Sequence, residues 1–226
     1  MEKPTKETIH DLLVRNVPLE VIMGIEEALV VGAQRAYIAA RGMDDGHLPS
    51  VVGQLRHFHM NELFQRALAA HGAFPSPIRG NSIVTGRTGV FTLARFNVKE
   101  GFWVNGRRSQ TRRQMSMANK AIEPLVQPEL FGEYEPTSDA VVFFVACFAG
   151  SLQFRPETPV SIQIAVPDRN MQGWLFREPI DVFAKRYYQE PMSQQNDLAM
   201  PKLKSCTRRA PVQERTDRNA TRAGAP

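Results

Sequence analysis

The apolar positions in the first third of the chain recur with the 3.6-residue period of an α-helix. They predict three helices, over residues 5–16, 18–41 and 50–72. Thr5 is the expected N-terminal cap of the first helix, and Gly72 is the expected stop of the third. The second helix is apolar over most of its circumference, which predicts a buried central helix.

After the Pro75–Pro77 breaker the pattern changes from helical to β-like. Two stretches are rich in β-branched and aromatic side chains, residues 82–85 and 90–98. They flank Gly86–Gly89, which predicts a β-hairpin with Arg87 at its tip. We interpret residues 102–104 as a short third strand.

A helical pattern returns over residues 107–125, with Pro124 expected to kink or end the helix. The remaining pattern predicts a loop at 127–138, strands at 141–148, 161–166 and 172–176, and a last helix opened by Pro179. The run 141–148 consists of apolar β-formers throughout, as expected of a central strand. The order of elements predicts one α+β domain: N-terminal helices, then a mixed or antiparallel sheet with one or two further helices.

We assign this domain to residues 1–192, with a helical part (1–72) and a sheet-containing part (73–192). Residues 193–226 contain no aromatic side chain and are polar and basic, which predicts a disordered basic tail. No apolar run is long enough for a membrane helix, and the N-terminus does not resemble a secretory signal. Cys147 and Cys206 imply neither a disulfide framework nor a zinc site, so we expect a cytoplasmic protein.

Charge is distributed unevenly along the chain. Residues 73–122 contain nine Lys or Arg and one acid, although the net charge of the whole chain is only +5. Residues 123–192 carry ten acids and five basic side chains. A strongly basic stretch favours a polyanionic partner, and nucleic acid is the first candidate.

The densest charge lies at the start of the helix predicted after the Asn105–Gly106 turn. Arg and Gln side chains contact phosphates and base edges in protein–DNA complexes. We therefore predict a nucleic-acid-binding site made of Arg87, Arg107, Arg108, Gln110, Arg112, Arg113 and Lys120.

Each part of this site also has a structural explanation that requires no nucleic acid. The cations of the helix are also explained by a solvated surface, or by pairing with the acids of residues 123–192. Arg87 is equally consistent with an ordinary turn. The interleaved aromatic residues, Phe91, Phe96, Phe102 and Trp103, either stack on unpaired bases or belong to the core.

Catalytic motifs are absent from the sequence. It contains no phosphate-binding loop, dinucleotide fingerprint, nucleophile elbow or paired Cys-x-x-Cys. His57 and His59 lie two residues apart, which directs them to different sides of a helix and prevents joint metal ligation. We predict no cofactor and no resident metal.

Three functions are compatible with these observations. The first is a non-enzymatic nucleic-acid-binding protein, most simply a DNA-binding regulatory or accessory protein that uses residues 79–120. The second is an interaction or inhibitor module that binds a protein partner. The third is a divergent metal-dependent nuclease that uses Glu26 or Glu27 together with Asp139 or Asp168.

Overall fold

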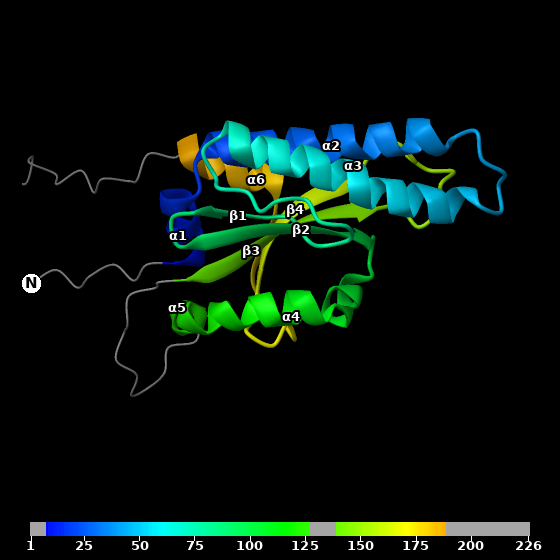
Figure 1. The fold of residues 1–226 in the computed structure, drawn as a ribbon. Helices are drawn as coiled ribbons and strands as arrows, with labels where there is room; N and C mark the ends of the chain where they lie inside the picture. The colour runs from blue at the N-terminus through cyan, green and yellow to red at the C-terminus, as the bar shows by residue number, and fades with distance from the viewer. Residues whose placement is uncertain (1–7, 127–138, 189–226) are drawn as a thin grey trace, which may run out of the picture. The chain divides into compact units, whose positions relative to one another are not determined.

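A pair of long helices covers one face of a β-sheet (Figure 1). The computed structural model describes residues 8–126 and 139–188. Its first helices are α1 (Ile9–Asn16), α2 (Leu19–Ala40) and α3 (Leu48–Ala70). α2 and α3 pack closely at Gly32, because a Cβ there would lie 2.8 Å from the Met60 Cα. A larger residue at position 32 would push the two helices apart.

Five strands form one mixed sheet in the order β1-β2-β3-β4-β5. They are β1 (Thr85–Thr88), β2 (Phe91–Lys99), β3 (Ala140–Phe148), β4 (Ser161–Pro167) and β5 (Trp174–Pro179). β2 and β3 are parallel, while the other neighbouring pairs are antiparallel. Parallel neighbours need a crossover connection, so the chain between β2 and β3 crosses a face of the sheet.

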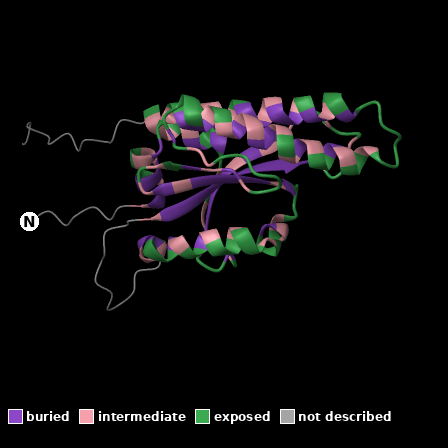
Figure 2. Cartoon of the chain, in the orientation of Figure 1, coloured by how far each residue is buried: buried purple, intermediate pink, exposed green. Residues whose placement is uncertain are grey.

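β3 is the centre of this sheet, and all nine of its residues are buried. Phe144 and its same-face neighbours pack toward α2 and α3, whereas Phe143 and Val145 belong to a second apolar cluster on the opposite face. Figure 2 shows the strands buried between two helical layers. The sheet therefore has a core on each side.

The crossover connection forms the layer on the second face. It contains η1 (Trp103–Arg108), α4 (Gln110–Ser116), η2 (Met117–Ala121) and α5 (Glu123–Val126). Met115 and Ala118 pack against the sheet from this layer. The last elements, α6 (Ile180–Ala184) and η3 (Lys185–Tyr188), lie on the α2 side, where Ile180 and Phe183 join the larger core.

The predicted α+β fold class is confirmed, and the sheet is mixed. Three positions in the sheet region were predicted wrongly. The first strand is Thr85–Thr88 rather than 82–85, and the last is Trp174–Pro179 rather than 172–176. Residues 102–104 form no strand, because Phe102 caps η1 and the next two residues belong to it. The helix α1 begins after a cap at Thr8, not Thr5, because Asp11 completes a capping box with Thr8. No helix in the described part of the chain is long and apolar enough to cross a membrane.

The single helix predicted over residues 107–125 is also wrong, because the chain forms separate short helices there. Ser109 starts α4 by accepting a hydrogen bond from the Arg112 N–H at 3.3 Å. At the other end, the Ser116 hydroxyl donates to the Arg112 carbonyl, and the chain tightens into η2. The predicted loop 127–138 and tail 193–226 lie outside the described residues.

Asn119 of η2 fastens the crossover layer to the sheet. Its buried amide donates to the carbonyls of Val141 and Pro167, at 3.1 and 2.7 Å. Its Oδ1 accepts the Val141 N–H at 2.6 Å. One side chain therefore pairs three buried backbone groups from two neighbouring strands.

We expect Asn119→Ala to lower the free energy of unfolding by roughly 2–4 kcal/mol, because it leaves those backbone groups without partners. Urea denaturation monitored by circular dichroism measures this change. Gln114→Ala, at an exposed position of α4, is the control and should stay within about 0.5 kcal/mol of the parent. A loss below about 1 kcal/mol for Asn119→Ala would contradict the assigned role.

Candidate nucleic-acid interface

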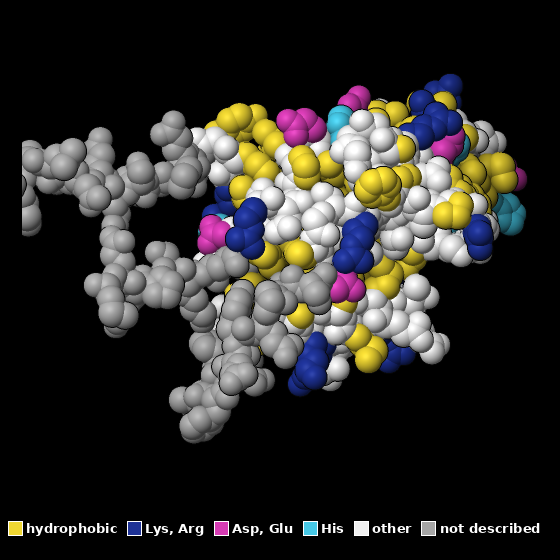
Figure 3. All heavy atoms as spheres, turned by 60° about the vertical axis from the view of Figure 1, so that its left-hand side comes forward, with side chains coloured by type: hydrophobic (Ala, Val, Ile, Leu, Met, Phe, Trp, Pro, Cys, Tyr) yellow, Lys and Arg dark blue, Asp and Glu magenta, His cyan; other side chains and the backbone are white. Residues whose placement is uncertain are grey.

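The outer surface of the crossover layer carries a row of exposed polar side chains. We call it the basic face, and it consists of Arg107, Arg108, Gln110, Arg113 and Lys120. It arises because Met115 and Ala118 on the inner side pack against the sheet. On the face drawn in Figure 3, Lys and Arg side chains are visible among the described atoms at the lower end of the molecule, where this layer lies.

Arg108, Arg113 and Lys120 make no hydrogen bond or ion pair with any other described residue. Gln110, the first residue of α4, likewise makes no side-chain hydrogen bond within the described part of the protein. Arg107 differs, because its guanidinium donates to the Gln172 carbonyl in the turn before β5. Its remaining N–H groups stay exposed.

The Arg112 side chain makes contacts within the protein and is not part of the basic face. Its guanidinium lies 4.6 Å from the centre of the Phe96 ring, and its Nε donates to the Gly106 carbonyl at 2.9 Å. Nη2 reaches the Asn105 carbonyl at 3.3 Å. Burial lowers the pKa of Arg112. This side chain closes η1 onto α4.

Arg87 lies within β1, opposite Thr92, so its predicted place at the tip of the hairpin is wrong. The turn falls two positions later, at Gly89, whose φ of 51° suits glycine. Arg87 is half-exposed and lies 4.0 Å from the Asp139 carboxylate. It is therefore separated from the basic face and faces an acid.

The acids of residues 123–192 that the structure describes do not neutralise the basic face. Their ion pairs are Asp139 with Arg87, Glu123 with Arg169 and Glu178 with Arg186. Asp168 instead accepts backbone N–H groups of its own turn. Within the described residues, the alternative that Arg108, Arg113 and Lys120 pair with this acidic block is therefore not observed.

The aromatic residues of the basic stretch divide between core and surface. Phe91 and Phe96 are buried in the two apolar clusters. Trp103 packs edge-on against Trp174, with ring centres 5.3 Å apart. Phe102 is 52 % exposed, and the Lys99 ammonium lies 5.1 Å from the centre of its ring.

Two buried arginines lie on the other face of the sheet, between β2 and α3. Arg95 is only 3 % exposed and donates to Asn61 at 2.9 Å, to Asn97 at 3.1 Å and to the His57 carbonyl at 2.6 Å. Arg56 lies 3.8 Å from the centre of the Phe148 ring, and its buried Nε has no hydrogen-bond partner.

Burial lowers the pKa of Arg95 to about 9 and that of Arg56 to about 10. Arg95 is one of the nine cations counted in residues 73–122, and its burial was not predicted from the sequence. The alternation of side chains along a strand could have indicated this burial. Arg95 lies two residues after the buried Leu93, so both side chains are on the same face of β2.

The four acids proposed for a nuclease lie on different elements: Glu26 and Glu27 on α2, Asp139 before β3 and Asp168 after β4. The pKa of Glu26 is raised by burial and by the nearby Asp181 of α6. Asp139 faces Arg87, and Asp168 holds its own turn. No group of three His, Cys, Asp or Glu residues within the described ranges is arranged to hold a metal ion.

Comparisons of the chain with protein-family models, with curated proteins and with solved structures found no match. The chemistry of its own side chains is therefore the basis for assigning a function.

Arg112 and its neighbour Arg113 should respond oppositely to substitution. We expect Arg112→Ala to lower the free energy of unfolding by roughly 1–3 kcal/mol, because it removes two hydrogen bonds and the contact with Phe96. Arg113→Ala should change it by less than about 0.5 kcal/mol. Urea denaturation of both variants tests this contrast, and equal effects would contradict it.

His57 should make folding sensitive to acid. Burial and the nearby Arg95 charge lower its pKa below the usual 6.5. The unfolded chain therefore takes up this proton at a higher pH than the folded chain, and stability falls as the pH drops below about 6.5. His57→Gln should flatten this part of the stability–pH curve, as measured by urea denaturation, whereas the exposed His47→Gln should leave it unchanged.

Proposed function

We propose that this protein is a non-enzymatic, cytoplasmic nucleic-acid-binding protein that holds DNA against the basic face, in a regulatory or accessory role. The observation that carries the proposal is the group of Arg108, Arg113 and Lys120, exposed on one layer without ion pairs to described residues. Like charges gathered on one surface repel one another, and a phosphate backbone relieves that repulsion.

The chemistry of the side chains fits this partner. Arg108 and Arg113 have guanidinium groups that can bond two phosphate oxygens at once, whereas Lys120 provides a point charge. Gln110 lies among them and offers both a donor and an acceptor, as base edges require. The cations therefore supply affinity, and Gln110 is a candidate for reading sequence.

Neutralising the three free cations tests the proposal. We expect Arg108→Gln, Arg113→Gln and Lys120→Gln together to weaken binding to duplex DNA and to flatten its salt dependence. Each lost phosphate contact reduces the slope of log K against log salt by about 0.9, so three contacts reduce it by roughly 2–3. Fluorescence anisotropy between about 50 and 200 mM salt measures both quantities.

A matched variant removes the same charge from elsewhere. Arg35→Gln, Arg41→Gln and Lys185→Gln take three exposed cations from the α2 and α6 side of the protein. This control should retain most of the affinity and nearly the parent's salt slope. If the two triple variants lost equal amounts of affinity and of salt slope, binding would depend only on net charge. That result would contradict the assignment of the basic face as the DNA-binding site.

A protein partner is the second candidate, because apolar side chains are exposed in the same layer. Val104 is 67 % and Met117 66 % exposed, together with the half-exposed Phe102 ring. Such side chains are typical of protein-binding surfaces. Binding that survives nuclease treatment, and is lost on Val104→Asp with Met117→Asp, would favour this candidate over DNA.

A further inference from the structure

A pocket opens between the first half of α3 and the turn at Arg79–Ser82. Its cavity is about 680 Å³, within the size range of small-molecule sites. Its lining residues include Ser50, Gly53, Gln54, His57, Phe58 and Asn81. The turn is closed by a hydrogen bond from the Ser82 N–H to the Arg79 carbonyl at 2.9 Å.

Gly53 keeps this pocket open on the helix side. A glycine inside a helix destabilises it relative to alanine, so it usually has a packing reason. Packing does not require it here, because a Cβ at residue 53 would have no heavy atom within 4 Å. A side chain at residue 53 would therefore extend into open space at the pocket.

Two amides and one aromatic ring are available at the pocket surface. The side chains of Gln54 and Asn81 make no hydrogen bond to another described residue, and Phe58 is 46 % exposed. His57 is already engaged, since its Nε2 lies 3.2 Å from the Asn61 Nδ2. A free amide presents the donor and acceptor that match a base edge, and an exposed ring stacks on a base.

Amides and aromatic rings bind both sugars and nucleotides, so these side chains alone do not select the ligand. The charge behind the pocket distinguishes a neutral sugar from an anionic nucleotide. Arg95 lies directly behind His57, donating to its carbonyl at 2.6 Å. Neither Arg95 nor Arg56 forms an ion pair with a described acid. Arg79, two residues before the pocket residue Asn81, is exposed and adds a further cation on this turn. The positive potential favours an anionic ligand.

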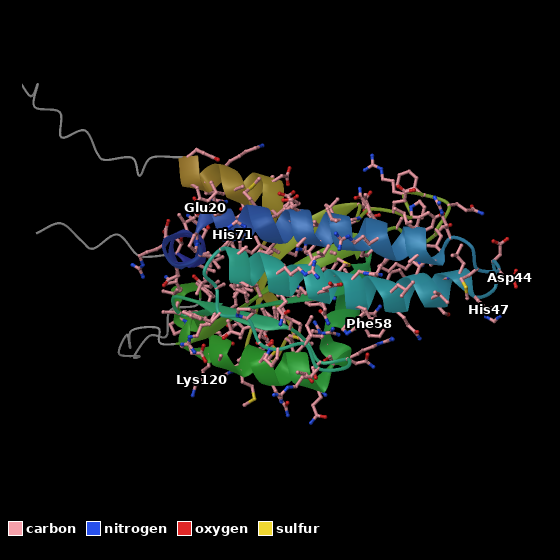
Figure 4. The ribbon with its side chains drawn as sticks, turned by 45° about the horizontal axis from the view of Figure 1, so that its top comes forward. Glu20, Asp44, His47, Phe58, His71 and Lys120 are labelled. Carbon is pink, nitrogen blue, oxygen red and sulfur yellow. The ribbon has the colours of Figure 1, made fainter. Side chains whose placement is uncertain are left out.

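We propose that this pocket binds a nucleotide whose base stacks on Phe58 and hydrogen-bonds to Gln54 and Asn81, with its phosphate toward Arg79. Figure 4 labels Phe58 on α3 and Lys120 on the opposite layer, so this pocket is distinct from the basic face. The nucleotide is either free in solution or an unpaired residue of a nucleic-acid strand. Only the second source rests on the proposed function.

In the test, the 5′-monophosphates of adenosine, guanosine, cytidine and uridine are titrated separately into the full-length chain. Binding is measured from the changes in amide NMR chemical shifts. At least one should bind saturably, and ribose 5-phosphate, which lacks the base, should bind more weakly. Phe58→Ala should weaken that binding by roughly 5- to 100-fold. Phe154→Ala, which removes a 60 % exposed ring elsewhere, should leave it unchanged.

Gly53→Leu provides a second variant, because it extends a side chain into the pocket without meeting a neighbouring atom at the Cβ. It should abolish nucleotide binding while the protein melts at or above the parent's temperature. A single-stranded oligonucleotide distinguishes the two sources. If the ligand is a residue of a strand, the oligonucleotide should bind more tightly than the mononucleotide. That binding should be lost in Gly53→Leu, and it should also be lost when the oligonucleotide carries no bases.

Absence of saturable binding by all four mononucleotides and by the oligonucleotide would overturn the proposal. Unchanged affinities in both Phe58→Ala and Gly53→Leu would do the same. A wrong assignment of the basic face would be detected separately. In that case the variant Arg108→Gln, Arg113→Gln and Lys120→Gln would keep the parent's affinity for duplex DNA. Mononucleotide binding by that triple variant should equal the parent's.

Discussion

The burial of β3 on both faces is the constraint on which the other layers depend. A strand whose nine residues are all buried needs apolar cover above and below. α2 and α3 cover one face, and the parallel pairing of β2 with β3 brings the crossover connection onto the other. That connection is amphipathic, so the apolar side that covers β3 leaves its cations on the outside. The position of the basic face is therefore a consequence of how the core is built.

The same constraint separates cations that are neighbours in the sequence. Arg112 folds back over Phe96 and pairs with carbonyls of η1, while Arg113 faces solvent. Arg95 lies in β2 on the side that faces α3, where hydrogen bonds from its guanidinium replace an acidic partner. Burying a cation without a carboxylate is unfavourable, which explains its lowered pKa. A count of charges along a segment does not give the charge of a surface.

Periodicity was sufficient to predict the long helices, the first hairpin, the central strand and the α+β class. It could not predict the parallel pairing of β2 with β3, because strand direction depends on contacts between distant segments. Nor could it show that Ser109, Ser116 and Asn119 divide one expected helix, since their hydrogen bonds include partners in other elements. For the candidate site, side-chain type indicated Arg108, Arg113 and Lys120, but Arg87 and Arg112 needed coordinates to be recognised as paired within the protein.

Charge segregation along the sequence persists in space because the described acids of the second half pair locally. Glu123 binds Arg169 in the turn between β4 and β5, and Glu178 binds Arg186 from β5 to η3. These partners lie within the acidic block itself, so each pair neutralises an acid without using a cation of the basic face. Asp139 is the exception, but its partner Arg87 lies in β1 rather than in the crossover layer. Screening by salt is then the main effect that weakens the field of the basic face, which makes ionic strength the natural variable for its binding.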